Sequence, residues 1–369
     1  MFSRVVDSLL VNRTRRIENK FNCIPWGFDR FESAGMYGIE KGKYFIVTGN
    51  HKSAKTQITD HLFMYNPIKW VLKNKDAGIK VKIIYFTLEM SKEQKLLQAV
   101  SNKLFTDSSF SIRKSPAELK SIPKNYILEE NILNKIQENE KYFTDTFLDI
   151  VTFVDNIKNP TGILKYVKEY LLNNGTEVKK TAIIDGKETE IFDYYVPNDP
   201  EEHLIVIVDH ASLISTEKDA NTLKLAIELL SKYFMELRNK YKIIPVLVQQ
   251  QASSQESTEN MKFNKLKPTA DGLAESKLTV RDCDVCFGIF TPFRHGLARY
   301  PESSDGYDIT KFKDNIRFLE VIASRDGGAN NITALMFDGA TNYFSELPKT
   351  NELERMNRVY NFISSIRNE

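Results

Sequence analysis

The most distinctive chemical pattern in the sequence is a candidate phosphate-binding loop, Gly49-Asn50-His51-Lys52-Ser53-Ala54-Lys55-Thr56. It follows the apolar run 44–48 and precedes a segment with helical character. In such a loop, backbone N–H groups and the helix N-terminus bind phosphates, the lysine reaches the β- and γ-phosphates, and the hydroxyl binds Mg²⁺. The pattern therefore predicts that Lys55 contacts ATP or another nucleoside triphosphate, and that Thr56 binds its Mg²⁺.

One position departs from the G-x-x-x-x-G-K-[ST] pattern of such loops, because Ala54 replaces the second glycine. An added methyl is tolerated if the residue keeps φ below zero and the phosphate is not crowded. Nucleotide affinity therefore depends on the backbone conformation at Ala54. A coincidental GxxxxxKT is the alternative interpretation, and the strand before it and the helix after it argue against that.

Two acidic residues that follow other apolar runs are candidates for metal binding and catalysis. Asp209 ends the run 203–208, and a carboxylate at the C-terminal end of a buried strand can bind the Mg²⁺ of a nucleotide. An aspartate there is also a common helix cap, so its interpretation depends on the loop. Glu89 ends the next run after the helix of the loop, where a carboxylate can orient or deprotonate the attacking water.

The elements that must position these residues are short apolar strands separated by helical segments. Continuous apolar runs, each followed by a helix, are typical of a largely parallel sheet covered on both faces. We therefore predict an α/β fold. The apolar runs occupy residues 44–49, 81–89, 149–155, 203–209, 243–249, 284–290, 317–324 and 332–338, and a helical stretch occupies 222–241.

Two segments stand apart from this alternation. Between about residues 173 and 200, two β-prone runs flank Asp185-Gly186, a strong signal for an inserted β-hairpin. Residues 2–20 have apolar side chains at helical spacing and predict an amphipathic helix ahead of the main domain. Its apolar stripe needs a partner, either in its own core or on a neighbouring subunit.

Composition limits the classes of function that remain. The chain has 369 residues and a formal net charge of +2, too small to bind nucleic acid by bulk charge, so any such contact must be local. Three cysteines are too few for a disulfide framework, which favours a cytoplasmic protein, and Cys283 and Cys286 are interpreted as small core residues. Neither a signal peptide nor a membrane-spanning segment is predicted.

Seven short segments, in the same order, resemble the motifs of DnaB-type replicative DNA helicases of bacteria and phages, whose motor is a RecA-like ATPase. Cys23-Ile24-Pro25-Trp26-Gly27-Phe28-Asp29 resembles G-I-P-T-G-F, Thr87-Leu88-Glu89-Met90-Ser91 resembles S-L-E-M, Asp209-His210-Ala211-Ser212-Leu213-Ile214 resembles D-Y-L-Q-L-M, Pro245-Val246-Leu247-Val248-Gln249-Gln250-Gln251 resembles P-V-I-A-L-S-Q, Asp271-Gly272-Leu273-Ala274-Glu275-Ser276 resembles S-D-L-R-E-S, Asp282-Cys283-Asp284 resembles D-A-D, and Ala323-Ser324-Arg325-Asp326-Gly327 resembles K-Q-R-N-G.

The resemblance implies a RecA-like P-loop ATPase core that hydrolyses ATP with Mg²⁺ at the interfaces of a ring, most often a hexamer, and translocates on single-stranded DNA. It implies that Glu89 is the catalytic base, that Gln251 senses the γ-phosphate, and that Arg325 is a finger inserted into the next subunit's site. An arginine after a strand is also commonly a surface ion pair. By the same resemblance, the partners are single-stranded DNA, further copies of the chain and a primase or loader, travel is 5′ to 3′, and the compact form is phage-like, which would place it in a bacterial cytoplasm.

The resemblance also divides the chain. Residues 1–20 correspond to the linker helix that docks on the adjacent subunit, and residues 21–369 to the motor domain, which ends in a helix at about 351–367. The helical N-terminal collar domain of the family has no counterpart.

The loops that line the DNA channel in this family correspond to the region after Gln251, where six copies of a modest basic patch would converge. Residues 255–281 carry five basic and four acidic side chains, so an ordinary solvated loop is the alternative. The candidate DNA contacts are Lys262, Lys265, Lys267, Glu275, Ser276 and Lys277.

Three alanines replace functional residues of the family: Ala54 in the phosphate loop, Ala323 in place of a lysine that reads the γ-phosphate, and Ala274 in place of an arginine in the DNA loop. These changes leave two alternatives to a helicase. One is a RecA- or KaiC-like ATPase that does not unwind DNA, and the other is a RecA-like scaffold or loader subunit with weakened catalysis.

Overall fold

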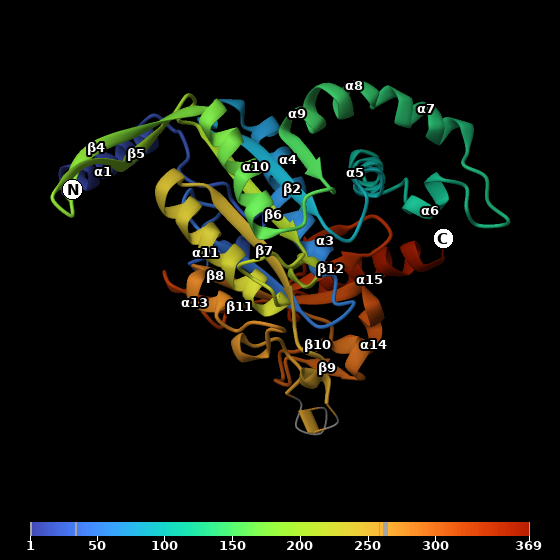
Figure 1. Ribbon diagram of the computed structural model, residues 1–369. Coiled ribbons are helices and arrows are strands. Elements are labelled where there is room, and N and C mark those ends of the chain that lie inside the picture. Colours follow the sequence, from blue (N-terminus) through green and yellow to red (C-terminus); the bar gives the residue numbers. More distant parts are fainter. Residues whose placement is uncertain (1, 34, 258, 261–264, 369) are drawn as a thin grey trace.

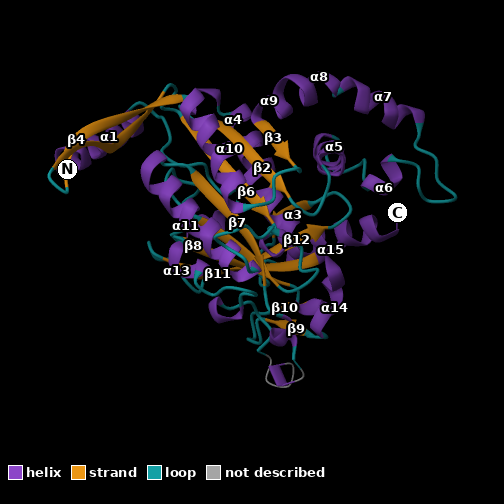
Figure 2. Ribbon diagram, viewed as in Figure 1, coloured by secondary structure: helices purple, strands orange, loops and turns teal. Residues whose placement is uncertain are grey.

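A nine-stranded central sheet organises the protein, as a computed structural model shows (Figures 1 and 2). The structure describes every residue except 1, 34, 258, 261–264 and 369. In sheet order the strands are β13 (Tyr343–Glu346), β12 (Ile332–Asp338), β11 (Ile316–Ser324), β8 (Val285–Phe290), β1 (Phe45–Gly49), β7 (Ile244–Gln250), β6 (Glu202–Asp209), β2 (Lys80–Thr87) and β3 (Val151–Val154).

The strands from β8 to β3 are all parallel, whereas β11, β12 and β13 continue the sheet in antiparallel order. Each predicted apolar run is a strand, so the α/β fold with a largely parallel sheet is confirmed. The sequence did not indicate β13, the antiparallel edge, or the short pair β9 (Arg299–Tyr300) and β10 (Tyr307–Asp308).

Helices cover both faces of the sheet, which explains why the strands are apolar on both sides. Alternate residues of β1 belong to different cores: Phe45 and Val47 face a core with α3 and α4, whereas Ile46 faces a core with α10 and α11. The helices are α1 (Phe2–Ile17), α2 (Asp29–Ser33), α3 (Lys55–Asp60), α4 (Asn66–Lys73), α5 (Lys92–Asp107), α6 (Pro116–Leu119), α7 (Glu130–Glu138), α8 (Glu140–Tyr142), α9 (Leu148–Ile150), α10 (Pro160–Asn173), α11 (Leu223–Tyr241), α13 (Thr279–Asp282), α14 (Ile309–Phe312) and α15 (Leu353–Asn368).

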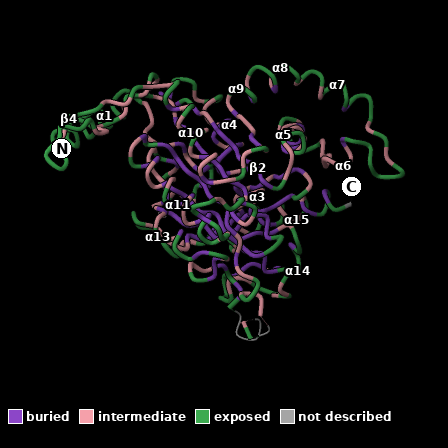
Figure 3. The backbone as a smooth tube through the Cα atoms, viewed as in Figure 1, coloured by how far each residue is buried: buried purple, intermediate pink, exposed green. Residues whose placement is uncertain are grey.

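An arm made of α1 and the inserted hairpin projects from the body (Figure 1). The hairpin pairs β4 (Gly175–Ile184) with β5 (Lys187–Pro197) around Asp185-Gly186, whose positive φ angles suit a type I′ turn. The Arg4 guanidinium of α1 lies 2.6 Å from the Asp193 carboxylate of β5. Helix α1 buries none of its residues, so the arm is largely exposed (Figure 3). Both segments were predicted, and the apolar stripe of α1 has no partner among the described residues.

Two further sequence predictions can be compared with the fold. Cys283 and Cys286 are buried in the core beside α11, as predicted, and burial raises the pKa of the Cys283 thiol to about 12. Among the described residues, no helix is long and apolar enough to cross a membrane.

Candidate nucleotide-binding site

The predicted phosphate loop lies at the carboxyl end of β1 and leads directly into α3. Gly49 allows the tight turn, because a Cβ there would overlap Ser53 Oγ and lie 2.7 Å from the carbonyl oxygen of Ile289. Lys55, the first residue of α3, is buried, and its ammonium donates a hydrogen bond to the carbonyl oxygen of Asn50 at 2.8 Å. The loop therefore closes on itself around its lysine.

The electrostatic setting of Lys55 is acidic. Burial lowers the pKa of Lys55 to about 8, and the negative charges of Asp209, Glu89 and Glu256 oppose that effect. Asp209 and Glu89, predicted from separate segments of the sequence, thus both act on the same ammonium group. The parallel register explains this convergence, because Thr87 of β2 pairs with Asp209 of β6 at the same edge of the sheet.

Ala54 adopts the left-handed conformation, with φ 76° and ψ 33°. The sequence analysis made a negative φ the condition for an unimpaired loop, and the structure does not meet that condition. A Cβ at positive φ is strained, by roughly 1–2 kcal/mol in the left-handed region. The loop thus keeps the backbone conformation for which glycine is suited, although the residue is alanine.

Oxygen atoms suited to Mg²⁺ face each other beside the loop. The Thr56 hydroxyl donates to Asp209 Oδ1 at 3.1 Å. Within the loop, the buried Asn50 Oδ1 and Ser53 Oγ have no hydrogen-bond partner among the described residues. Hard oxygen donors of this kind, next to unsatisfied polar atoms, fit a Mg²⁺ ion and the phosphates that it accompanies.

Glu89 lies in the turn between β2 and α5, and its side chain is 59% exposed. Its Oε2 is 3.5 Å from Nε2 of His210, the residue after Asp209. Glu89 is therefore open to solvent at the edge of the phosphate loop, where a water molecule has access. His210 was not singled out from the sequence, because its role depends on this contact across two strands.

The three glutamines at the end of β7 alternate in direction. Gln251 is buried, donates to Thr48 Oγ1 at 3.0 Å, and does not reach the phosphate loop with its side chain. Gln250 reaches the loop instead, with Nε2 3.4 Å from His51 Nδ1. The side chain next to the loop is thus one residue earlier than the γ-phosphate sensor that the resemblance indicated.

Arg294 also touches the loop and was not expected from the sequence. It follows β8, the neighbour of β1, and its guanidinium donates to the carbonyl oxygen of His51. Its Nε is 3.8 Å from Glu256, which also contributes to the field at Lys55. No motif marks this arginine, because only the adjacency of β8 and β1 brings it to the loop.

Comparisons with known proteins identify this architecture. One solved ATPase domain, from a DnaB-like helicase, matches over 93% of this chain and 99% of its own length, with a TM-score of 0.64 and 15% identity. A DnaB-like replicative helicase, solved in connection with its interactions with primase, matches over 92% of this chain and 68% of its own, with a TM-score of 0.62 and 14% identity. A KaiC-like protein, PH0186 of Pyrococcus horikoshii OT3, matches at a TM-score of 0.43 and 10% identity, over 88% of this chain and 99% of its own. No protein-family model and no curated protein matches the chain.

The chain has the RecA-like fold of DnaB-like helicase ATPase domains. Within this RecA-like fold, Arg325 lies at the opposite edge of the sheet from the phosphate loop, since the neighbouring Ser324 pairs with Val285 at the start of β8. Its side chain is 51% exposed, and its Nε donates to the carbonyl oxygen of Cys283 at 3.0 Å and lies 3.7 Å from Asp284 Oδ1. Arg325 therefore cannot serve its own loop, and the predicted role requires a second subunit.

The candidate DNA residues have varied surroundings. Lys262 lies outside the described residues. Lys265, Lys267, Glu275 and Lys277 are exposed, and Lys267 lies 3.4 Å from Glu320. Ser276 is buried, and its hydroxyl donates to Glu228 Oε1 at 3.0 Å, so its side chain supports the loop from inside.

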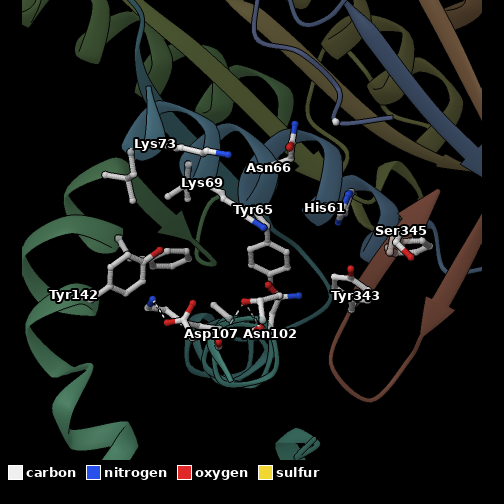
Figure 4. Close-up of a pocket in the computed structure, with 18 of the residues that line it drawn as sticks. His61, Tyr65, Asn66, Lys69, Lys73, Asn102, Asp107, Tyr142, Tyr343 and Ser345 are labelled. Carbon is white, nitrogen blue, oxygen red and sulfur yellow. Dashed lines mark hydrogen bonds and ion pairs between the residues drawn. The ribbon is translucent and has the colours of Figure 1, made fainter. Parts of the chain in front are cut away.

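A cavity of about 570 Å³ lies elsewhere, between α4, α5 and β13 (Figure 4). Tyr65, Asn102 and Tyr343 line it, and none of its lining residues belongs to the phosphate loop. The nucleotide site is therefore an open loop at the sheet edge rather than this larger hollow.

Proposed function

We propose that the protein is an ATP-dependent DNA helicase of the DnaB type, which works as a ring on single-stranded DNA. The observation that carries the proposal is the convergence of Lys55, Thr56, Asp209 and Glu89 at one edge of a RecA-like sheet. These groups come from three separate segments, and their chemistry matches the parts that phosphoryl transfer requires.

Each group has a distinct part in hydrolysis. The Lys55 ammonium and the N–H groups of the loop hold the phosphates, and Thr56 Oγ1 and Asp209 Oδ1 are positioned to hold Mg²⁺. The bound ion bridges the β- and γ-phosphate oxygens and neutralises developing charge. Glu89 accepts a proton from the attacking water, and His210, 3.5 Å away, orients the carboxylate.

The ring is proposed because the site of a single chain lacks an arginine that could reach the γ-phosphate from the opposite side. Arg325 projects from the far edge of the sheet, where it would reach the loop of a second copy and stabilise the charge that develops there. Exposed Phe2, Leu9 and Leu10 on α1 would pack on that second copy. Head-to-tail contacts of this kind close into rings, and we propose a hexamer.

For DNA, we propose that Lys265, Lys267 and Lys277 line the channel of the ring, with Lys262 beside them. Six copies of a few lysines would give a phosphate-tracking surface that a near-neutral chain lacks by itself. A primase or loader is a further proposed partner.

Ala54 favours a second candidate function. A left-handed alanine between the phosphate-binding N–H groups strains the loop, which would suit a scaffold or loader subunit with weak turnover.

Native mass measurement with and without a non-hydrolysable ATP analogue tests the proposal. We expect a monomer or mixed small species without nucleotide and a ring of defined mass with it. Lys55→Met should not form the nucleotide-dependent ring. A mass that does not change with nucleotide would contradict the proposed interface, and a nucleotide-dependent ring without turnover would favour the scaffold.

A further inference from the structure

Behind Asp209, on the side away from the phosphate loop, lies a fully buried polar cluster formed by Asp60 of α3, Tyr85 of β2 and Lys95 of α5. All three side chains have 0% exposure. The Lys95 ammonium donates to both oxygens of Asp60, at 2.9 and 3.0 Å, and to the Tyr85 hydroxyl at 2.8 Å. The Tyr85 hydroxyl lies 2.8 Å from Asp60 Oδ1 and 3.0 Å from Asp209 Oδ2.

The number of hydrogens decides how this cluster is connected. An ammonium has three N–H groups, and here Asp60 and the tyrosine oxygen accept all of them. The single hydrogen of Tyr85 is then available for one carboxylate. Asp60 already accepts two charged donors, whereas Lys95 Nζ is 3.7 Å from Asp209 Oδ2, beyond hydrogen-bond distance. The tyrosine hydrogen therefore belongs on Asp209 Oδ2.

This connection fixes the direction of the Asp209 carboxylate. Its Oδ2 is held from behind by Tyr85, and its Oδ1 points to the Thr56 hydroxyl at 3.1 Å. Lys95 follows Glu89 by six residues, and Asp60 follows Lys55 by five. The cluster thus joins the segments that carry the phosphate loop, the candidate base and the candidate metal ligand.

Packing alone does not require charge at these positions. A buried ion pair can often be replaced by apolar residues of similar volume without loss of stability, so the presence of one ammonium beside two carboxylates calls for another explanation. Burial raises the pKa of Asp60, which Lys95 opposes and Asp209 reinforces. Without Lys95, the two carboxylates would compete for the single tyrosine hydrogen.

We propose that Tyr85 and Lys95 are positioning residues that hold the Asp209 carboxylate in the orientation that binds Mg²⁺, with Asp60 as the counter-charge that keeps Lys95 in place. The inference rests on the proposed nucleotide site and adds residues to it that touch neither the nucleotide nor the metal. Their effect should therefore appear in the Mg²⁺ dependence and not in the binding of the nucleotide itself.

The first test is Tyr85→Phe, which removes the hydroxyl and keeps the ring. Binding of a fluorescent ATP analogue is titrated with Mg²⁺ and, separately, measured in EDTA. We expect the Mg²⁺ concentration for half-maximal enhancement to rise about tenfold or more, the usual effect of losing a group that orients a metal ligand. Affinity in EDTA should stay at the wild-type value.

Tyr44→Phe is the matched control. Tyr44 is also fully buried, and its hydroxyl is 3.2 Å from Ser231 Oγ, in the core on the other face of the sheet. Its loss should leave the Mg²⁺ dependence unchanged. An equal shift in both variants would overturn the inference, because it would show a general effect of removing a buried hydroxyl.

The second test is a charge rescue that a merely structural role would not produce. In Lys95→Met, the unpaired Asp60 should take the tyrosine hydrogen from Asp209 and weaken Mg²⁺ binding about tenfold. Adding Asp60→Asn removes the competing charge, so the double variant should recover most of the Mg²⁺ affinity. If Lys95→Met does not fold, the double variant still decides: Mg²⁺ affinity as weak as in Tyr85→Phe would overturn the role of charge.

The outcomes separate this inference from the proposed function. Wild-type protein that binds no nucleotide, with or without Mg²⁺, would overturn the nucleotide site and the inference together. Wild-type protein with Mg²⁺-dependent binding that Tyr85→Phe leaves intact would overturn the inference alone.

Discussion

Replacing Lys55 by methionine should make the nucleotide-free protein more stable while it abolishes nucleotide binding. Lys55 is 9% exposed, and its burial lowers the pKa from 10.5 to about 8. At about 1.4 kcal/mol per pKa unit, keeping this lysine charged in the folded state at pH 7 costs roughly 3 kcal/mol. Its hydrogen bond to the Asn50 carbonyl oxygen returns about 1 kcal/mol.

Methionine has a similar length and no charge, so Lys55→Met should gain roughly 1–2 kcal/mol in the free energy of unfolding at pH 7. The pH dependence gives the sign independently. Between pH 8 and 10.5 the unfolded chain holds the proton that folded Lys55 has lost, so wild-type stability rises with pH through this window. The advantage of the methionine variant should shrink over the same window.

Urea unfolding of both proteins at several pH values from 7 to 10.5 measures these differences. Lys41→Met is the matched control, because burial lowers the pKa of Lys41 to about 8 as well, and Lys41 binds the carbonyl oxygen of Pro200, far from the loop. It should show a similar pH trend in stability and keep nucleotide binding. A Lys55→Met protein that is less stable than wild type at pH 7, or that still binds nucleotide, would refute this account of the loop.

Further predictions concern the other residues of the site. Glu89→Gln should keep nucleotide binding and lower turnover by ~10²-fold or more in a steady-state ATPase assay, whereas unchanged turnover would leave Glu89 as a surface residue. Ala54→Gly should relieve the left-handed strain and raise nucleotide affinity or leave it unchanged, as equilibrium titration would show; a clear loss would mean that the loop binds phosphate in another conformation. Arg325→Ala should lower turnover by ~10³-fold or more, and mixing it with Lys55→Ala should restore part of the activity at interfaces where an intact loop meets an intact arginine. Failure of the mixture to recover, together with turnover that does not depend on protein concentration, would show that Arg325 does not act in trans.

The fold could be predicted from the sequence because its strands are buried on both faces. Runs such as 203–208 have no polar alternation, and a run of this kind followed by a helix fits a parallel sheet. The antiparallel edge could not be predicted in the same way. Strands β11 and β12 are as apolar as the parallel ones, and their direction is set by the connections and not by side-chain pattern.

The phosphate loop was legible because its residues are consecutive, so a single segment carries the chemistry. Gln250, Arg294 and the cluster of Asp60, Tyr85 and Lys95 were missed because each depends on contacts between segments. Gln250 and Gln251 differ only in which way the strand turns its side chain, and that depends on register. The backbone at Ala54 was a condition that the sequence could state but not decide.

The measurement that tests the central claim most directly is ATP-dependent unwinding of a forked DNA duplex with one labelled strand. The account predicts strand release that requires ATP, Mg²⁺ and a single-stranded tail, and that Lys55→Met and Glu89→Gln abolish. ATP hydrolysis without strand release, or release that both variants retain, would contradict the assignment of this chain as a helicase.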